Sequence, residues 1–167
     1  ELLSAWLGYN GYPIIGVAHR QRNLGADQFS REQREMSGFG HIFRKEPIEK
    51  MYQVLSEGKM LGLVSDQDAK NRGIFVNFLN QQASTPKGAA HFQKNTGAPM
   101  VFITCTWQSS NKYEINCEKV ISEPNDTVKD ITQRYSTILE KIIKQSPEQY
   151  FWWHQRWKTK SIQNNGQ

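Results

Sequence analysis

Three polar clusters follow predicted strands in the first half of the chain. They are residues 19–23 (HRQRN), 43–46 (FRKE) and 65–68 (SDQD). Ligands of sheets with parallel strands gather at the carboxyl ends of those strands. These three clusters are therefore where the sequence predicts a functional site.

The charged residues of these clusters suit more than one kind of chemistry. Arg20 and Arg22 carry planar forks of donors that could bind a phosphate or stabilise a developing oxyanion, or they could lie in a solvated loop. Asp66 and Asp68 could bind a hard cation, pair with arginines or cap a turn. No further acidic ligand lies near them in the sequence. We therefore favour an Asp–Arg network that shapes a pocket over a metal site.

Other residue types that often carry chemistry give no motif. The four histidines, which show no metal-ligand spacing with cysteine or with one another, are His19, His41, His91 and His154. No serine, cysteine or histidine arrangement amounts to a nucleophile motif, so these residues do not establish catalysis. Cys105 and Cys117 lie in separate predicted strands, and we expect them to be reduced core thiols in a reducing cytoplasm.

The stretch PEQYFWWHQRWKTK (147–160) interleaves aromatic and basic residues. Such a stretch could stack nucleic-acid bases or lie at a membrane interface. It could also form a terminal helix with its tryptophans in the core and its cations facing out. Trp152, Trp153 and Trp157 cannot share one narrow stripe of a helix, so we expect at least one of them to contact something beyond a single core face.

Helices and strands alternate along the chain, which predicts an α/β fold with a largely parallel central sheet flanked by helices. We expect strands at 14–19, 39–43, 60–65 and 74–78, a strand pair at 98–107 and 112–121, and helices ending near 9 and spanning 26–38, 47–58, 84–97 and 127–145. Thr85 is the expected N-cap of helix 84–97, with Pro86 at its first position and Gly97 at its end.

Composition limits the class of protein but not its partner. The chain has 167 residues, about one domain, and 37% hydrophobic residues indicate a globular chain. No apolar run approaches the ~20 residues of a membrane-spanning helix. The net charge of +5 favours an acidic partner, and nucleic acid, an anionic membrane surface and an acidic carrier protein all qualify.

Residues 146–160 resemble the terminal signature of the late acyltransferases of bacterial lipid A biosynthesis, with Gln155 and Lys160 in place of common arginines. Residues 58–68 and 72–103 are similar to the central block of that family in order and spacing, although residues 77–80 (NFLN) replace its usual Pro-Phe-Phe-Gly. The resemblance implies a glycerolipid-acyltransferase-like fold. It predicts that residues 1–162 are the C-terminal part of a single acyltransferase domain and that 163–167 are a polar tail.

The resemblance implies transfer of a fatty acyl chain from acyl carrier protein to a hydroxyl of a lipid A precursor. It implies membrane association at the cytoplasmic face of the bacterial inner membrane, with no nucleic acid, metal or cofactor involved. The family motif His-x-x-x-x-Glu/Asp aligns its acid with Glu1 and places its histidine five residues upstream, outside this chain. That histidine would be the general base, and Glu1 would orient its ring and stabilise the imidazolium.

The resemblance assigns further roles residue by residue. Arg20 is similar to the arginine after the second strand of the family, and Asn23 to the asparagine that follows it. The spacing is one residue short, so Arg22 is expected to share the role. Asp66 matches the acidic residue of the third block, and we expect it to pair with an arginine, with Arg44 as the candidate, and to shape the acceptor site. Asp68 joins Arg22, Asn23 and Arg44 as an expected substrate-binding residue.

Two alternative functions remain open at this point. The first is a related acyltransferase that uses another glycolipid acceptor or acyl-CoA. The second is a non-catalytic basic module that binds nucleic acid or an anionic membrane. If the resemblance holds, the terminal tryptophans would serve the core and a membrane-facing rim instead of nucleic-acid bases, and the charge would suit an acidic carrier protein.

Overall fold

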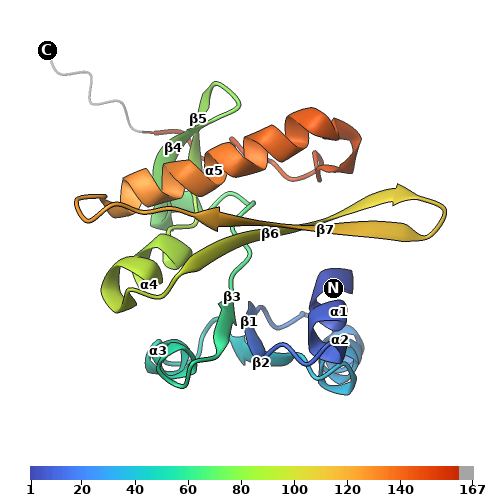
Figure 1. Ribbon diagram of the computed structural model, residues 1–167. Coiled ribbons are helices and arrows are strands. Elements are labelled where there is room, and N and C mark those ends of the chain that lie inside the picture. Colours follow the sequence, from blue (N-terminus) through green and yellow to red (C-terminus); the bar gives the residue numbers. More distant parts are fainter. Residues whose placement is uncertain (162–167) are drawn as a thin grey trace, which may run out of the picture. The chain divides into compact units, whose positions relative to one another are not determined.

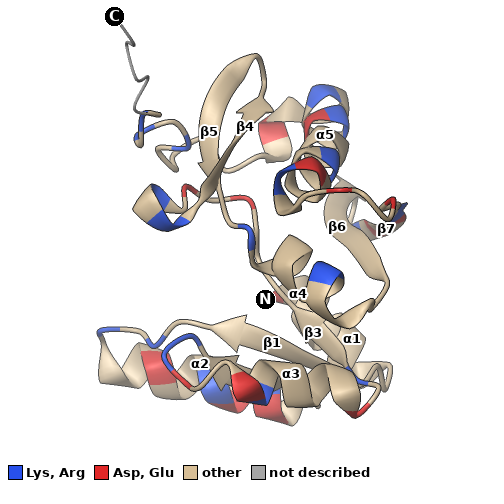
Figure 2. Cartoon of the chain, turned by 90° about the vertical axis from the view of Figure 1, so that its left-hand side faces the viewer, with Lys and Arg blue, Asp and Glu red and all other residues tan. Residues whose placement is uncertain are grey.

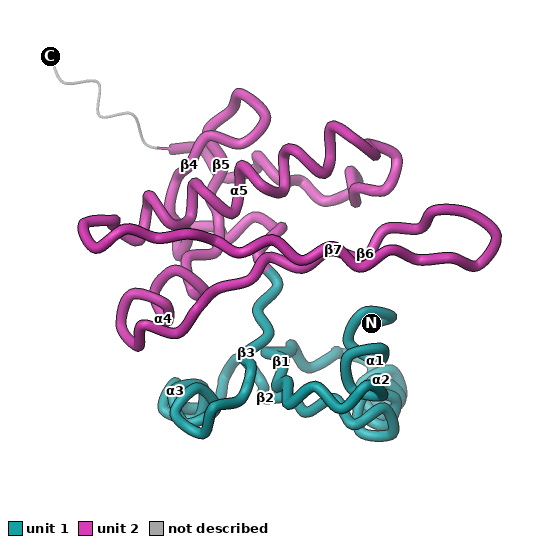
Figure 3. The backbone as a smooth tube through the Cα atoms, in the orientation of Figure 1, with its two compact units in different colours: residues 1–64 teal, residues 65–167 magenta. Residues whose placement is uncertain are grey.

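The computed structural model describes residues 1–161, which form two compact units (Figure 3). The first unit spans residues 1–64 and the second begins at Ser65. Residues 162–167, which include the predicted polar tail, lie outside the described residues.

The first unit alternates helices and strands (Figure 1). Its elements are α1 (Leu2–Tyr9), β1 (Ile14–Ala18), α2 (Leu24–Met36), β2 (Gly40–Phe43), α3 (Glu49–Ser56) and β3 (Met60–Gly62). The three strands form a parallel sheet in the order β2-β1-β3. Parallel neighbours require a crossover, and α2 and α3 supply it. The expected parallel arrangement is confirmed in this unit, where the last strand ends three residues earlier than predicted.

The core of the first unit lies where α1 meets the sheet. Leu7, Ile14 and Phe39 are buried together, and Leu3 and Met60 pack against them. The other helix next to α1, α2, carries acidic and basic residues along its length (Figure 2). Ile42 of β2 and Met51 and Val54 of α3 are also buried, so the apolar residues of this unit are not confined to the cluster at α1.

The second unit is built from two hairpins and two α-helices. Its elements are η1 (Lys70–Arg72), β4 (Ile74–Phe78), β5 (Gln81–Thr85), α4 (Gly88–Thr96), β6 (Met100–Ser109), β7 (Lys112–Val120), α5 (Val128–Gln145) and η2 (Pro147–Gln149). The pairs β4-β5 and β6-β7 are separate two-stranded antiparallel sheets.

The α/β class is confirmed, but the largely parallel central sheet is limited to β1–β3 among the described residues. The reason lies in the turns. Leu79 and Asn80 have φ values of 50° and 63°, and Ser110 and Asn111 have 36° and 69°. Two successive left-handed residues make the tight turn of an antiparallel hairpin. The chain thus returns directly after β4 as β5, a strand that was not predicted from the sequence.

The predicted helix 127–145 is confirmed as α5, and it organises the core of the second unit. Thr127 and Asp130 form a capping box at its start. Ile131 and Tyr135 are buried with residues of α4 and β7. Tyr135 donates a hydrogen bond to the Pro86 carbonyl, and burial raises the pKa of its hydroxyl to about 12, so the hydroxyl stays neutral.

Two local expectations about α4 have different outcomes. Gly97 ends the helix in the left-handed region with φ 70°, as predicted. The expectation that Thr85 is the N-cap is wrong, because Thr85 pairs with Ile74 in the β4-β5 hairpin and the cap falls on Lys87. Tertiary pairing of the strand therefore overrides the local capping preference.

The cysteines lie on β6 and β7, as expected, and both are free thiols. Cys105 is half-buried, but Cys117 is exposed, so the expectation of a core thiol is wrong for Cys117. Cys117 pairs with Ile103, two residues before Cys105, so both thiols lie on the same face of the hairpin, and β7 is the more exposed of the two strands.

One glycine contact in the first unit predicts a loss of stability. A Cβ on Gly8 would lie 2.7 Å from the Phe39 amide nitrogen and closer still to the Ser37 carbonyl oxygen. Gly8→Ala should therefore lower the free energy of unfolding by about 1–3 kcal/mol, because backbone must move. Urea unfolding followed by circular dichroism measures this change.

Gly25→Ala on α2 is the matched control. A Cβ there meets its nearest atom at 3.4 Å, an ordinary contact. Alanine also suits a helix better than glycine, so stability should stay equal or rise by up to about 1 kcal/mol. Equal stability of the two variants would contradict the close approach of α1 to α2.

Candidate active site

The first two polar clusters come together at the carboxyl edge of the parallel sheet. β1 and β2 end side by side at Ala18 and Phe43, and the Arg44 amide donates to the Ala18 carbonyl at 2.9 Å. Arg44 Nη1 then lies 2.9 Å from His19 Nε2. The sheet register thus joins clusters 19–23 and 43–46 as predicted, and gives Arg44 a partner that sequence reasoning did not pair with it.

Arg20 is anchored at this edge by a buried carboxylate. Its guanidinium lies 3.9 Å above the Phe43 ring centroid and 3.5 Å from Asp27 Oδ2. Asp27 is 7% exposed and also accepts from the Gln21 amide at 2.8 Å. Because the Arg20 side chain is 64% exposed, its other donors remain open to an anion. Asp27 was missed by sequence reasoning, although its i, i+4 pairing with Arg31 on α2 was a readable signal.

Asn23 and Arg22 have different surroundings. Asn23 is the N-cap of α2, where its side-chain oxygen accepts from the Ala26 amide at 3.0 Å. That oxygen serves the helix, so a role in binding falls to the amide NH2 group. Arg22 is exposed. Their roles in substrate binding stay predictions.

Glu1 is held by two parallel hydrogen bonds from Arg34 of α2. Arg34 Nε and Nη2 donate to the two carboxylate oxygens at 3.0 and 2.5 Å. The hydrogen bonding from Arg34 is the main reason why the pKa of Glu1 lies below its ordinary value of 4.5. Glu1 is therefore ionised at neutral pH and fixed in orientation. The two residues are 33 positions apart, so no local sequence signal pairs them.

The second unit holds the third cluster and ties it to the terminal segment, residues 150–161. The Tyr150 hydroxyl donates to the Asp66 carbonyl at 3.2 Å, and Thr159 Oγ1 donates to Asp68 Oδ2 at 2.8 Å. The Oδ1 atoms of both aspartates are buried without a hydrogen-bond partner. The expected pair of Asp66 with Arg44 joins residues of different units, and it stays a prediction.

Arg156 is the buried centre of the terminal segment. It is 1% exposed, and it donates from Nη1 to the Ser84 carbonyl at 2.8 Å and from Nη2 to Thr85 Oγ1 at 2.5 Å. Its guanidinium lies 4.9 Å from the Phe78 ring centroid. Burial lowers the pKa of Arg156, and the nearby Tyr150, Asp68 and Asp66 oppose this shift.

The alternative that residues 147–160 form a terminal helix is wrong. The segment makes one short 3-10 turn at Pro147–Gln149 and continues through turns and bends. Arg156, a cation expected outside, is in the core, whereas Trp153 is 90% exposed. Trp157 stacks on Phe78 at 5.7 Å, so it belongs to the core. That at least one of the tryptophans contacts something beyond the core stays a prediction.

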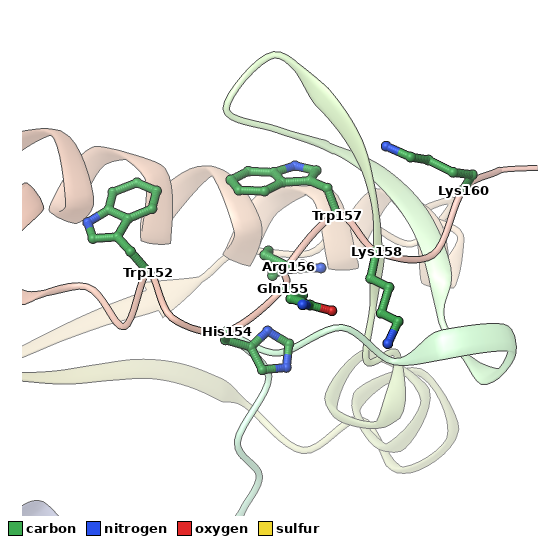
Figure 4. A pocket seen from close by; sticks show the side chains of 7 residues that line it. All are labelled: Trp152, His154, Gln155, Arg156, Trp157, Lys158 and Lys160. Carbon is green, nitrogen blue, oxygen red and sulfur yellow. The ribbon is translucent and has the colours of Figure 1, made fainter.

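The same segment surrounds an open hollow with a volume of about 490 Å³ (Figure 4). Its lining residues are Trp152, His154, Gln155, Arg156, Trp157, Lys158 and Lys160. Figure 4 shows the His154 and Lys158 side chains extending to the same side of the segment. The hollow combines cations with indole rings.

Residues 1–161 contain neither a cluster of metal ligands nor a membrane-spanning helix. No group of three or more His, Cys, Asp or Glu side chains is placed to hold a metal ion in that range. None of the helices described there is both long and apolar enough to cross a membrane.

The chain matches known proteins over almost its whole length. The sequence profile of the family described as bacterial lipid A biosynthesis acyltransferase matches residues 1–159. The chain therefore belongs to the bacterial lipid A biosynthesis acyltransferase family, and the predicted resemblance is confirmed.

Two curated relatives are similar to the chain. A lipid A biosynthesis lauroyltransferase of Escherichia coli (strain K12) is 29% identical over 89% of this chain and 49% of its own length. A phosphatidylinositol mannoside acyltransferase of Mycolicibacterium smegmatis is 22% identical over 94% of this chain and 53% of its own length. The chain spans about half the length of these curated relatives.

The contact between Arg34 and Glu1 predicts a measurable pKa change. Arg34→Gln removes the guanidinium, so the pKa of the Glu1 carboxyl should rise toward 4.5. In the wild type, the pair stabilises the fold above the ordinary pKa, and this contribution is lost as pH falls through the lowered one. Carboxyl carbon NMR during a pH titration measures the shift.

Arg31→Gln is the control for this titration. Arg31 also lies on α2, but it faces Asp27 Oδ2 at 3.6 Å. The Glu1 pKa should stay unchanged in this variant. An equal shift in both variants would point to the general charge of α2 and contradict the specific pair.

The buried fork of Arg156 predicts a cost for a change that keeps the charge. Arg156→Lys loses the two-pronged donation to Ser84 and Thr85, and it leaves a buried acceptor unpaired. The free energy of unfolding should fall by about 1–3 kcal/mol in urea denaturation. Arg72→Lys, at an exposed arginine of the same unit, should change it by less than about 0.5 kcal/mol. Similar values for both would argue against a structural role of Arg156.

Proposed function

We propose that the protein containing this chain is an acyltransferase that moves a fatty acyl chain from acyl carrier protein to a hydroxyl of a lipid A precursor. It acts at the cytoplasmic face of the bacterial inner membrane. The family match over residues 1–159 supports the reaction class. The single structural observation that carries the proposal is the carboxylate of Glu1, which Arg34 keeps ionised and oriented.

In the proposed mechanism, Glu1 is the acid partner of a histidine base, which the family resemblance places five residues before it. The histidine takes the proton of the acceptor hydroxyl as that oxygen attacks the thioester carbonyl carbon. The C–S bond then breaks, and the thiol of the carrier leaves with the proton from the imidazolium. Glu1 acts by orienting the ring and stabilising its charged form.

The arginines at the carboxyl edge of the sheet are the proposed electrostatic partners of the reaction. The thioester oxygen becomes negative during the attack and needs donors. Arg20 suits this role because Asp27 and Phe43 fix its guanidinium while most of the side chain stays exposed. Arg22 and Arg44 extend the same cationic edge, and we assign them, with Asn23, to substrate binding.

Asp66 and Asp68 are proposed to shape the acceptor site in the second unit. Each has one oxygen that is buried and unpaired in the described chain. Hydrogen bonds from Tyr150 and Thr159 hold the loop in place, which supports a shaped site over a solvated turn.

The acceptor and the acyl donor each have a second candidate within the enzyme class. The name of the mycobacterial relative specifies a phosphatidylinositol mannoside, so another anionic glycolipid is the second candidate acceptor. Acyl-CoA is the second candidate donor. The net charge of +5 favours acidic acyl carrier protein, since a basic surface attracts an acidic protein.

Loss of the Glu1 carboxylate tests the proposal directly. In the complete protein, Glu1→Ala should lower turnover by about 100-fold or more, because the proposed base loses its orienting partner. The measurement is transfer of radiolabelled acyl chains from acyl carrier protein to a lipid A precursor.

The matched control is Glu35→Ala, which removes an exposed glutamate from the same unit. Its turnover should equal that of the wild type, and thermal unfolding of both variants should stay close to the wild type. Wild-type turnover in Glu1→Ala would refute the assigned role of Glu1.

A further inference from the structure

We propose that the hollow along the terminal segment binds the phosphorylated sugar headgroup of the acceptor lipid. This inference rests on the proposed function and names a subsite for its substrate. The hollow has a volume of about 490 Å³ and is lined by seven residues of the segment (Figure 4). The hollow is shallow and open, so a ligand there keeps part of its own surface in solvent.

Charge is the first argument for a phosphate. Arg156 is buried and donates to the Ser84 carbonyl and to Thr85 Oγ1, so its guanidinium is already engaged inside the protein. Within residues 65–161, the ion pairs involve α5 residues and leave Lys158 and Lys160 without a carboxylate partner. Both lysines line the hollow and are exposed. Figure 4 shows the Lys158 side chain on the side of the segment where His154 lies and the Lys160 side chain on the opposite side, so the two ammonium groups offer separate contacts to an anionic ligand.

The ring faces of the lining residues are the second argument. His154 lines the hollow and lies between the two lining tryptophans along the chain. The Trp157 indole is held by Phe78 and by donation from Nε1 to the Phe78 carbonyl at 3.3 Å. Trp152 is fixed by donation from its Nε1 to the Pro147 carbonyl at 2.6 Å. Rigid indoles offer apolar faces at low entropic cost, and they suit the C–H faces of a sugar ring.

The position of the segment next to the aspartates is the third argument. Tyr150 and Thr159 belong to the same segment as the lining residues, and they bond to Asp66 and Asp68. The family resemblance assigns Asp66 to the acceptor site. The segment that lines the hollow therefore also holds the loop of that site in place. A headgroup in the hollow would therefore lie beside those aspartates.

The test measures lipid binding without requiring turnover. The complete protein in neutral detergent is titrated with micelles that carry lipid A, phosphatidylglycerol at the same phosphate content, or no added lipid, by isothermal titration calorimetry. Lys158→Ser/Lys160→Ser removes the two free cations. The control Lys112→Ser/Lys119→Ser removes two exposed lysines of β7 in the same unit.

We expect the wild type to bind lipid A micelles more tightly than phosphatidylglycerol micelles. The Lys158/Lys160 variant should lose about tenfold or more in affinity for lipid A, at about 1 kcal/mol per lysine, and the control variant should lose less than about twofold. In the acyl transfer assay, the Lys158/Lys160 variant should raise the KM for the acceptor with little change in kcat.

Three outcomes would overturn the proposal. Equal losses of affinity for lipid A and for phosphatidylglycerol would show that the two lysines bind any anionic membrane surface. Equal losses of affinity in the two lysine variants would show that net charge alone determines binding. An increase in the KM for acyl carrier protein, with that for the acceptor unchanged, would assign the hollow to the carrier. Each can occur while wild-type transfer is normal, and failure of the proposed function would instead appear as no transfer by the wild type.

Discussion

The second unit depends on a guanidinium that lies almost completely inside it. Arg156 is 1% exposed, and burial of such a charge is costly unless hydrogen bonds and nearby opposite charges compensate. Ser84 and Thr85 of β5 accept from it, and Asp66 and Asp68 supply negative charge. These partners come from two parts of the chain, β5 and the acidic loop 65–68, and both are distant in sequence from Arg156. The arginine thus links the β4-β5 hairpin, the acidic loop and the terminal segment.

A consequence of this link is that the terminal segment needs no helix to be ordered. Its backbone follows turns, and its shape is held by side chains: Tyr150 on Asp66, Thr159 on Asp68 and Trp157 on Phe78. Residues that face away from this network, Trp153 above all, remain exposed. The same anchoring leaves Lys158 and Lys160 at the rim of the hollow, where they remain available to a ligand.

The first unit brings its polar groups together through the register of its parallel sheet. Parallel strands end at a common edge, so His19 and Arg44 meet although 25 positions separate them. A buried carboxylate, Asp27, then fixes Arg20 from below while the guanidinium stays exposed. Arg34 does the reverse at Glu1, where a mostly buried cation fixes an exposed carboxylate. In both pairs the less exposed partner sets the position of the more exposed one, which is the group available for chemistry.

The sequence by itself determined the α/β class, the positions of most helices, the family and the clusters at 19–23 and 43–46. These follow from local periodicity, capping residues such as Thr127, and motifs whose spacing is specific. Tertiary structure decided what depends on distant partners. Thr85 is a strand residue and not a cap, and Leu79 and Asn80 form the turn of a hairpin. Arg156, which the alternative of a terminal helix placed at the surface, lies in the core. Arg34 pairs with Glu1 although 33 positions separate them in the sequence. Residue type and spacing report local preferences, but the free energy of burying a charge or pairing a strand depends on partners that only the folded chain brings together.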